Sequence, residues 1–299
     1  MTGPAPLHPG PAGPPVVSDY QRSQRQLERL AYRRRRATRG ITVATVSTVV
    51  VAVVAVLAVT RAPGWPRVRA TFFSGPDFVA AFPDVLSGFW LNVQMFLVAE
   101  VCVLALGLAV AIVRSVRTPA LFPIRALAIA YVDVFRGVPL LLVVFLVGFG
   151  VPALNLTGVT NDPVVLGTAA LVLSYSAYVA EVYRAGIESI HPSQRAAARA
   201  LGLKQHQAMR YVVLPQAVRR VVPPLLNDFV SLQKDTALVA VIGPLEAVRQ
   251  AQIYASGKFN YTSYMVAALL FIALTIPLAR LTDRIAARTA RRQGPGGAA

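Results

Sequence analysis

Windows of about twenty residues with almost no charge recur along this chain. A helix needs about twenty apolar residues to cross the hydrocarbon core of a bilayer. Backbone polar groups in lipid must bond within their own segment, and the alternation expected of barrel strands is missing, so the windows are predicted to be helices. The sequence therefore predicts an all-α integral membrane protein, a helical bundle of about six transmembrane helices. The predicted spans are 41–60, 89–113, 138–155, 164–184, 223–243 and 262–281.

The basic residues fall in blocks between these windows. The net charge is +17, but no basic patch is interleaved with aromatic residues, so we expect no nucleic-acid partner. Of the 30 lysines and arginines, 24 lie in the N-terminal tail, in the loops 114–136 and 184–220, and in the tail after residue 279. Five lie in the alternate loops 61–88, 156–163 and 244–261, which are expected on the other side of the membrane. Loops rich in lysine and arginine stay in the cytoplasm. We therefore expect both termini and the segment 185–222 on the cytoplasmic side.

The ends of the chain have a different composition from the spans. Residues 1–40 are rich in proline and then in arginine, and we expect them and the tail 291–299 to be disordered. The window 41–60 is too long and begins too late for a signal peptide, so it is predicted to be a true first span. The single cysteine, Cys102, lies in an apolar window, and the three histidines are scattered. We expect no disulfide and no metal site.

A polar, alanine-rich segment, residues 194–215, separates two apolar windows. Ser193 or the preceding pair His191–Pro192 can begin a helix there, since proline is tolerated in the first turn. The run AAARAL favours a helix, and Gly202 is expected to end it in a C-cap role.

A second helical stretch, about 204–213, is expected to stop before Pro215, because the residue before a proline disfavours the α region. The segment thus predicts two short cytoplasmic helices joined by a glycine turn. Small alanine side chains allow close approach of the membrane domain itself or of a soluble partner. A solvated connecting helix is the alternative interpretation.

The spacing in this segment resembles the EAA signature of ABC-transporter permeases: Glu-Ala-Ala, three residues, Gly, nine residues, an aliphatic residue, any residue, then Leu-Pro. Ala197–Ala198 match the two alanines, Gly202 the glycine, Val212 the aliphatic position and Leu214–Pro215 the end. Ala196 stands where the family pattern has glutamate.

Further stretches are similar to the polar amino-acid importer branch of that family, the histidine, glutamine and glutamate types. They are YVDVFRGVPLLLVVFLVGFG (131–150), YSAYVAEVYRAGIESI (175–190) and VVLPQAVRRVVPPLLNDFVSLQKDTALVAVIG (212–243). The resemblance covers about residues 85–290, with a coupling segment at 187–215. The span 41–60 looks like an addition to a five-helix family core.

The resemblance implies a multi-pass permease subunit in a bacterial cell membrane. Its implied partners are a second permease subunit, identical or different, a cytoplasmic ATPase dimer, an extracytoplasmic solute-binding protein and a polar amino acid. ATP and magnesium would bind the ATPase, and the chain lacks the G-x-x-x-x-G-K-[ST] loop of a nucleotide site. The residues implied to contact the ATPase are Ala196, Ala197, Ala198, Gly202, Leu214 and Pro215.

Polar side chains inside three spans are predicted to line the solute pathway. Ionisable groups cost about 2.5–3.5 kcal/mol each at the centre of a span, so they usually face a cavity or a partner. Shared helix faces group Asn92 with Glu100, Ser174 with Tyr178 and Glu181, and Asn227 with Ser231 and Lys234, with Asp228 and Asp235 alongside. In a zwitterionic solute, Lys234 would meet the carboxylate and Glu181 or Glu100 the ammonium. Alternatively, Lys234 pairs with an acidic neighbour and holds helices together.

Two other classes of protein remain as alternatives. An intramembrane enzyme needs a nucleophile and a base in facing spans, but Ser174 and Ser231 have no histidine within any predicted span. A channel or scaffold that is not coupled to ATP would not need a cytoplasmic segment shaped for an ATPase. We therefore expect a transport subunit that catalyses no covalent chemistry.

Overall fold

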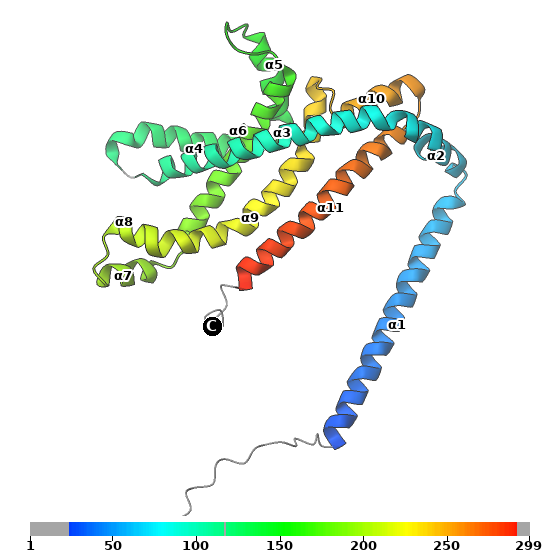
Figure 1. The fold of residues 1–299 in the computed structure, drawn as a ribbon, viewed down its shortest axis with the longest axis horizontal. Coiled ribbons are helices and arrows are strands. Elements are labelled where there is room, and N and C mark those ends of the chain that lie inside the picture. Colours follow the sequence, from blue (N-terminus) through cyan, green and yellow to red (C-terminus); the bar gives the residue numbers. More distant parts are fainter. Residues whose placement is uncertain (1–23, 117, 292–299) are drawn as a thin grey trace, which may run out of the picture. The chain divides into compact units, whose positions relative to one another are not determined.

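The computed structural model describes residues 24–116 and 118–291 (Figure 1). Every regular element within those ranges is a helix, as predicted. The chain divides into two units, Met1–Trp65 and Pro66–Ala299. The first unit contains α1, Gln24–Thr60, whose stretch Gly40–Thr60 is long and apolar enough to cross a membrane. Helix α1 begins inside the tail predicted to be disordered, whereas residues 1–23 and 292–299 lie outside the described part.

The second unit begins with a short helix, α2 (Trp65–Phe72), and a long one, α3 (Gly75–Ser115). Helix α3 has 41 residues and contains the predicted span 89–113. Its start is fixed by Ser74, whose side chain accepts a hydrogen bond from the Asp77 amide, with a proline in the first turn. Apolar residues along α3 pack against α6, α10 and α11, so this helix connects most of the unit.

The predicted span 138–155 contains a single short helix, which follows a sharp break at the first residues of the span. The structure has α4 (Phe122–Gly137) and α5 (Leu140–Ala153), bent by 111° at the break between them. Pro139 causes the break, because proline lacks an N–H and restricts the residue before it. Helix α5 has 14 residues, about 21 Å, which is too short to cross a bilayer core alone. Helix α4 occupies most of the predicted loop 114–136.

Helix α6 (Pro163–Glu188) is the central helix of the unit and contains the predicted span 164–184. Asp162 caps its start by accepting a hydrogen bond from the Val164 amide at 2.7 Å. The largest cluster of buried apolar side chains surrounds α6 and joins α3, α5, α9 and the 3₁₀ helix η3. Its members include Met95, Val144, Leu171, Leu232 and Val239.

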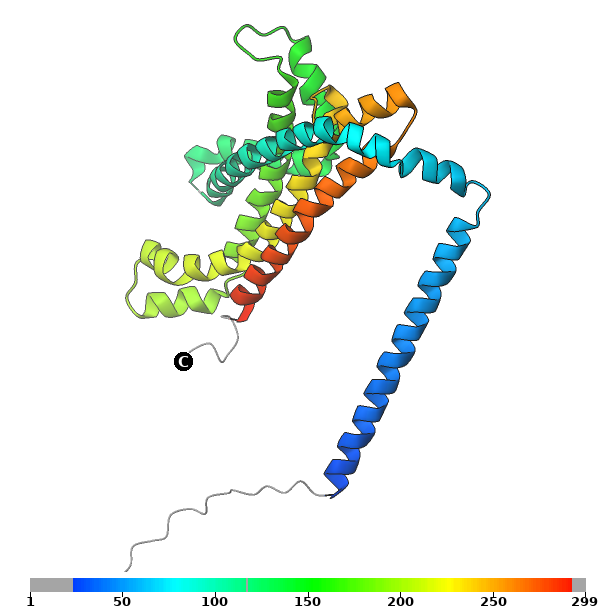
Figure 2. The ribbon, with the colours of Figure 1, turned by 45° about the vertical axis from the view of Figure 1, so that its right-hand side comes forward.

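The predicted span 223–243 corresponds to two elements, α9 (Leu214–Asp235) and η3 (Thr236–Ile242). Helix α9 lies between α6 and α11 (Thr262–Arg291) and packs against both (Figures 1 and 2). Helix α10 (Ala247–Lys258) connects η3 to α11. Within the described residues, four helices are long and apolar enough to cross a membrane, or five if the bent α4–α5 pair is one span. The count of six is not confirmed.

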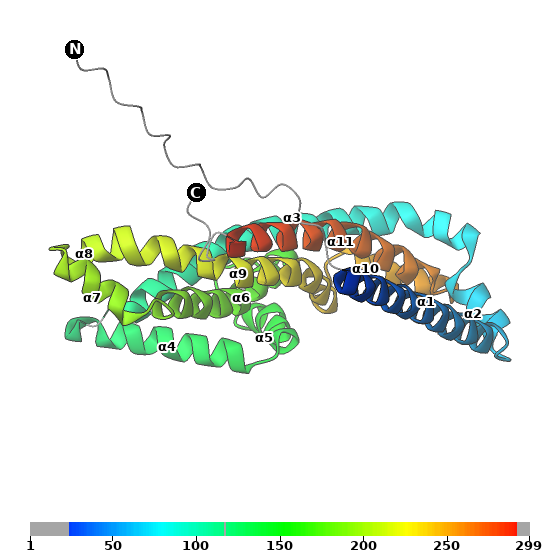
Figure 3. The same cartoon turned by 90° about the horizontal axis from the view of Figure 1, so that it is seen from below.

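The connection from α6 to α9 carries α7 (Pro192–Ala200) and α8 (Gln205–Ala208). These short helices lie at one end of the second unit, and α10 lies towards the other end (Figure 3). The predicted cytoplasmic segment and the predicted extracytoplasmic loop 244–261 are therefore on opposite sides of the bundle.

Candidate functional site

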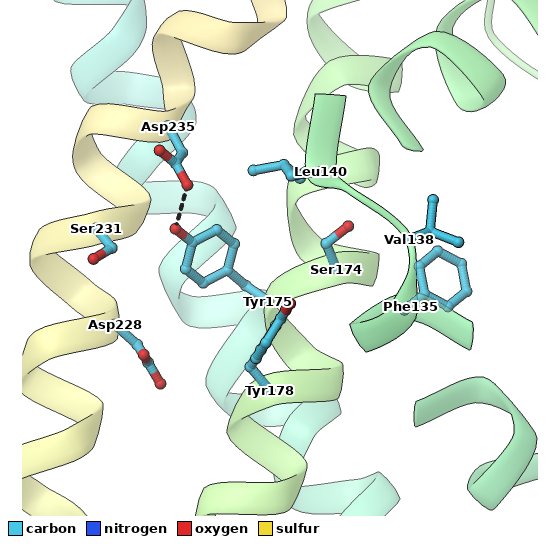
Figure 4. Close-up of a pocket in the computed structure, with 9 residues that line it drawn as sticks. All are labelled: Phe135, Val138, Leu140, Ser174, Tyr175, Tyr178, Asp228, Ser231 and Asp235. Carbon is cyan, nitrogen blue, oxygen red and sulfur yellow. Dashed lines mark hydrogen bonds between the residues drawn. The ribbon is translucent and has the colours of Figure 1, made fainter. Parts of the chain in front are cut away.

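A pocket lies between α6, α9 and the break that separates α4 from α5 (Figure 4). Its volume is about 320 Å³, the size of a small polar solute. The residues that line it are Phe135, Val138, Leu140, Ser174, Tyr175, Tyr178, Asp228, Ser231 and Asp235. Since the bend at Pro139 brings the end of α4 and the start of α5 to α6, the pocket depends on the broken helix pair.

Four of the predicted pathway residues share this pocket: Ser174, Tyr178, Ser231 and Asp235. Ser174 and Tyr178 share the face of α6 that helical spacing predicts, Ser231 and Asp235 come from α9, and the packing of α6 against α9 brings the four together. Asp228, one turn before Ser231, belongs to the same wall. Tyr175, which is not among the predicted pathway residues, also lines the pocket, and its hydroxyl donates to Asp235 Oδ2 at 2.6 Å. Tyr175 directly follows Ser174, and this position beside a predicted pathway residue is the one feature of the sequence that could have identified it.

The pocket contains polar atoms that the protein does not satisfy. Ser174 is only 2% exposed, and neither its Oγ nor the buried Oδ2 of Asp228 has a hydrogen-bond partner within the described residues. Buried polar groups in folded proteins normally have such a partner. The hydroxyl and the carboxylate are therefore available to bind a polar solute.

Charge and aromatic faces give the pocket a preference. Two carboxylates line it, Asp228 and Asp235, and no lysine or arginine does. The rings of Tyr175 and Tyr178 lie 6.5 Å apart, and aromatic faces attract cations. The Arg136 guanidinium already lies 5.7 Å from the Tyr178 ring centroid. The arrangement favours an ammonium group over a carboxylate.

Asn92, the first predicted pathway residue on α3, is buried in a polar contact elsewhere. Its Nδ2 donates to Thr236 Oγ1 at 3.2 Å and to Glu246 Oε2 at 3.0 Å, and its Oδ1 accepts from the Ala247 amide at 3.0 Å. Gly88, one turn earlier, lets the backbones meet, because a Cβ there would lie 2.6 Å from the Glu246 carbonyl carbon. Asn92 therefore clamps α3 to the start of α10.

Glu246, which the sequence analysis did not identify, is fully buried in this clamp. It caps α10, accepting from the amides of Val248 at 3.0 Å and Arg249 at 2.7 Å. Burial raises the pKa of the Glu246 carboxyl, and these backbone hydrogen bonds oppose that rise. Its position immediately before the first residue of α10 did not distinguish it from an ordinary N-cap.

Glu181 is engaged by arginines. It accepts a hydrogen bond from Arg114 Nη1 at 2.8 Å, forms an ion pair with Arg184, and lies 3.9 Å from Arg136. Arg184 also pairs with Glu188. The network connects α3, the end of α4 and α6. A carboxylate compensated in this way is poorly placed to receive a solute ammonium.

The remaining predicted pathway residues do not line the pocket. Glu100 is half-buried on α3, while Asn227 and Lys234 are exposed on α9. Lys234 forms no ion pair within the described residues, so the alternative helix-holding role is not seen there either. A carboxylate-binding role for Lys234 stays a prediction.

The coupling segment begins where the sequence suggested. The imidazole Nδ1 of His191 accepts a hydrogen bond from the Ser193 amide at 3.2 Å, and Pro192 is the first residue of α7. Gly202 ends the helix with φ +82°, a left-handed conformation that glycine adopts without steric cost. The amides of Gly202 and Leu203 bond back to the carbonyls of Arg199 and Ala198 at 2.9 and 3.1 Å. The predicted C-cap is confirmed.

The predicted stop before Pro215 is wrong. After α8, a π-helical turn, η2 (Met209–Val213), leads directly into α9. The Leu214 amide bonds to the Met209 carbonyl five residues earlier. Pro215 cannot donate to the carbonyl four residues before it, and its ring would crowd that carbonyl in a regular α-helix. A π turn relieves this conflict, so Leu214–Pro215 begins α9 and makes the segment continuous with it.

The three alanines of the motif are not equivalent. Ala196 and Ala197 are exposed, whereas Ala198 is only 3% exposed, facing the chain itself. Beside them, Leu201 is 83% exposed. The surface that a partner can reach therefore includes Ala196, Ala197 and Leu201, and Ala198 supports it from within.

Comparison with known proteins gives a consistent result. Residues 106–294 match the family described as binding-protein-dependent transport system inner membrane component. The chain is 36% identical to the probable glutamine ABC transporter permease protein GlnM of Bacillus subtilis, over 66% of this chain and 89% of that protein. It is 34% identical to the arginine transport system permease protein ArtQ of the same organism, over 68% and 92%.

Solved structures agree on the fold. A crystal structure of an amino acid ABC transporter with histidines has a TM-score of 0.65 and 33% identity, covering 70% of this chain and 96% of that one. The MetNI methionine ABC transporter, at 20% identity and a TM-score of 0.56, shares the fold alone.

Proposed function

The chain belongs to the family of binding-protein-dependent transport system inner membrane components, and we propose that it is the permease subunit of an ATP-driven importer of polar amino acids. The pathway opens alternately to the two sides of the membrane, and the chain catalyses no covalent chemistry. The relatives named for glutamine and for arginine support this class of solute.

The pocket between α6 and α9 supports a route for the solute's ammonium. Asp228, Asp235 and the two tyrosine rings offer charge and aromatic surface, and Ser174 offers an unpaired hydroxyl. A solute with a second cationic group can use both carboxylates. A solute with a single ammonium group would bind Asp228, and Asp235 would keep its hydrogen bond from the Tyr175 hydroxyl.

The observation that carries the proposal is the helical hairpin formed by α7, Gly202 and α8. It extends from the end of α6, exposes a helix to solvent, and continues into α9, which forms one wall of the pocket. Motion imposed on α7 by a cytoplasmic ATPase thus has a direct mechanical route to the pocket. Coupling of this kind needs an element that moves as a body, and a capped helix joined to α9 provides one.

The remaining parts of the transporter follow from this role. We propose a pair of permease subunits, identical or different, a cytoplasmic ATPase dimer that binds ATP and magnesium, and an extracytoplasmic solute-binding protein. The Bacillus subtilis relatives support a location in a bacterial cell membrane. The distribution of lysine and arginine supports an orientation with both termini in the cytoplasm.

Substitution of Gly202 tests the coupling. Valine strains the left-handed position, because a β-branched residue at φ +82° is disfavoured, whereas asparagine tolerates it. In vesicles with the cognate ATPase and binding protein, we expect Gly202→Val to lower ATP-driven uptake at least about tenfold, a loss equivalent to about 1.4 kcal/mol. Gly202→Asn should retain most of the uptake.

The control is Gly257→Ala on α10, where a Cβ meets no atom within 4 Å and φ is not positive. This variant should transport normally. All variants should insert in the membrane in equal amounts. Normal transport by Gly202→Val would refute the coupling role, and uptake that needs no ATP would support the channel alternative.

A further inference from the structure

A basic concavity of about 240 Å³ lies between α7 and the α8–η2 stretch that follows it. It lies on the segment that the sequence predicts to be cytoplasmic. It shares no lining residue with the acidic pocket between α6 and α9. The residues that line it are Arg195, Arg199, Gln205, Ala208, Met209 and Val213. Two guanidinium groups in one small hollow form a recognisable receptor for an anion.

The two arginines of this concavity have N–H groups that donate no hydrogen bond within the described residues. Arg195 Nη2 donates to the Ile187 carbonyl at 3.0 Å, which fixes the side chain against the end of α6. Its Nε is buried and has no hydrogen-bond partner within the described residues. Arg199 is exposed, one helical turn further along α7. A buried guanidinium N–H without an acceptor points to an acceptor supplied from outside.

The chain itself does not supply that acceptor. Between Pro192 and Pro215 the sequence contains four basic residues and no aspartate or glutamate. The nearest carboxylate in sequence, Glu188, pairs with Arg184. Neither Arg195 nor Arg199 forms an ion pair in the part of the chain that the structure describes. At position 196, where a carboxylate three residues before Arg199 would pair with it, the residue is alanine.

We infer that this concavity receives a carboxylate side chain of the ATPase subunit, bound by Arg199 and by the free Nε of Arg195. The inference rests on the proposed function, in which α7 docks on an ATPase. Two exposed apolar side chains on the same segment favour a protein partner: Leu201 is 83% and Tyr211 is 64% exposed. Apolar anchors beside a desolvated charge pair are typical of the centre of a protein interface.

Arg199→Gln tests the charge pair, with Lys204→Gln as the matched control. Lys204 is an exposed cation of the same segment that does not line the concavity. The purified ATPase is titrated onto the permease in nanodiscs of zwitterionic lipid at fixed ionic strength. We expect Arg199→Gln to raise the Kd about tenfold or more and Lys204→Gln to change the Kd less than about twofold.

A second variant, Ala196→Glu, asks where the carboxylate comes from. A glutamate at 196 pairs with Arg199 within the helix and competes with the carboxylate of the ATPase. We expect Ala196→Glu to raise the Kd for the ATPase. Adding Arg199→Gln to this variant should then raise the Kd by a smaller factor than it does in the unchanged protein. Tighter binding by Ala196→Glu would overturn the inference, because it would show that the interface needs a carboxylate on this chain.

The outcomes separate the two proposals. If the ATPase does not bind the unchanged protein, the proposed function fails. If it binds and Arg199→Gln binds equally well, only the charge pair is refuted. If Arg199→Gln matters only when the nanodisc contains phosphatidylglycerol, the concavity binds a lipid phosphate and the inference is also wrong.

Discussion

At the scale of single residues, Asp228 is the clearest test of the pocket. Its Oδ2 is buried and has no hydrogen-bond partner in the described part of the chain, and asparagine keeps the shape while removing the charge. Hydrogen bonds to charged groups contribute about 1.5–3 kcal/mol, so Asp228→Asn should raise the solute concentration for half-maximal uptake by about ten- to a hundredfold. Uptake of radiolabelled arginine and glutamine in vesicles measures this effect. Asp133→Asn, an exposed carboxylate on α4 outside the pocket, is the control. Equal uptake by both variants would exclude Asp228 from the pathway.

Glu181 is expected to behave differently, as a residue that holds helices together. Glu181→Gln leaves Arg114, which is mostly buried, without its carboxylate. We expect a loss of about 1–2 kcal/mol of stability, after discounting for partial exposure, with no change in solute selectivity. Thermal unfolding in detergent, together with uptake, separates the two roles. Glu188→Gln, at the exposed end of the same network, should cost little. Altered selectivity in Glu181→Gln at unchanged stability would return Glu181 to the pathway.

At the scale of elements, charge-free windows predicted only part of the helices. Helix α6 was found because it is apolar and begins at a capped proline. The sequence predicts a loop where α4 lies, because Arg125, Asp133 and Arg136 interrupt its apolar residues. Hydropathy averaged over a window identifies only segments that are mostly apolar, and the charged residues of α4, like Arg219 and Arg220 in the first part of α9, keep these stretches below that level. The packing of α4 against α6, and of α9 against α6 and α11, depends on residues distant in the sequence, so a single window does not predict it.

The candidate site shows the same division between local and distant information. Helical spacing grouped Ser174 with Tyr178, and both line the pocket, because that information lies within one turn of α6. The same spacing grouped Ser231 with Asn227 and Lys234, which do not line it. It did not place Glu181, whose partner Arg114 is 67 residues away. The sequence also did not predict the π turn before Pro215. A proline normally predicts the end of a helix, and nothing in the sequence shows that the preceding turn widens to accommodate it. The continuous helix from α8 through η2 into α9 is seen only in the structure.

At the scale of the whole molecule, the family match begins at residue 106, well after α1. The two B. subtilis relatives are covered over about nine-tenths of their own lengths by roughly two-thirds of this chain. Among the residues whose side chains the structure describes, the buried apolar clusters lie after residue 66. These observations indicate that α1 is not part of the family core, which contains the pocket and the coupling segment.

We therefore expect a protein without residues 1–60 to fold and to keep its orientation. Removal of the tail deletes eight arginines, but the loops 114–136 and 184–220 still carry four and seven lysines and arginines, against three in 61–88. Those loops should keep their side in the cytoplasm. The unfolding temperature should stay within about 4 °C of the full chain, since no buried cluster is removed.

Cysteines introduced at Ser193 and Ser256, with Cys102→Ala as background, report the orientation through a membrane-impermeant thiol reagent. Only the cysteine at 256, on α10, should react from outside in intact cells, both in the full chain and in the shortened one. Reaction at 193 in the shortened chain alone would show that α1 sets the topology. Reaction at 193 in both would reverse the cytoplasmic assignment of α7, and with it the access of an ATPase to Arg199.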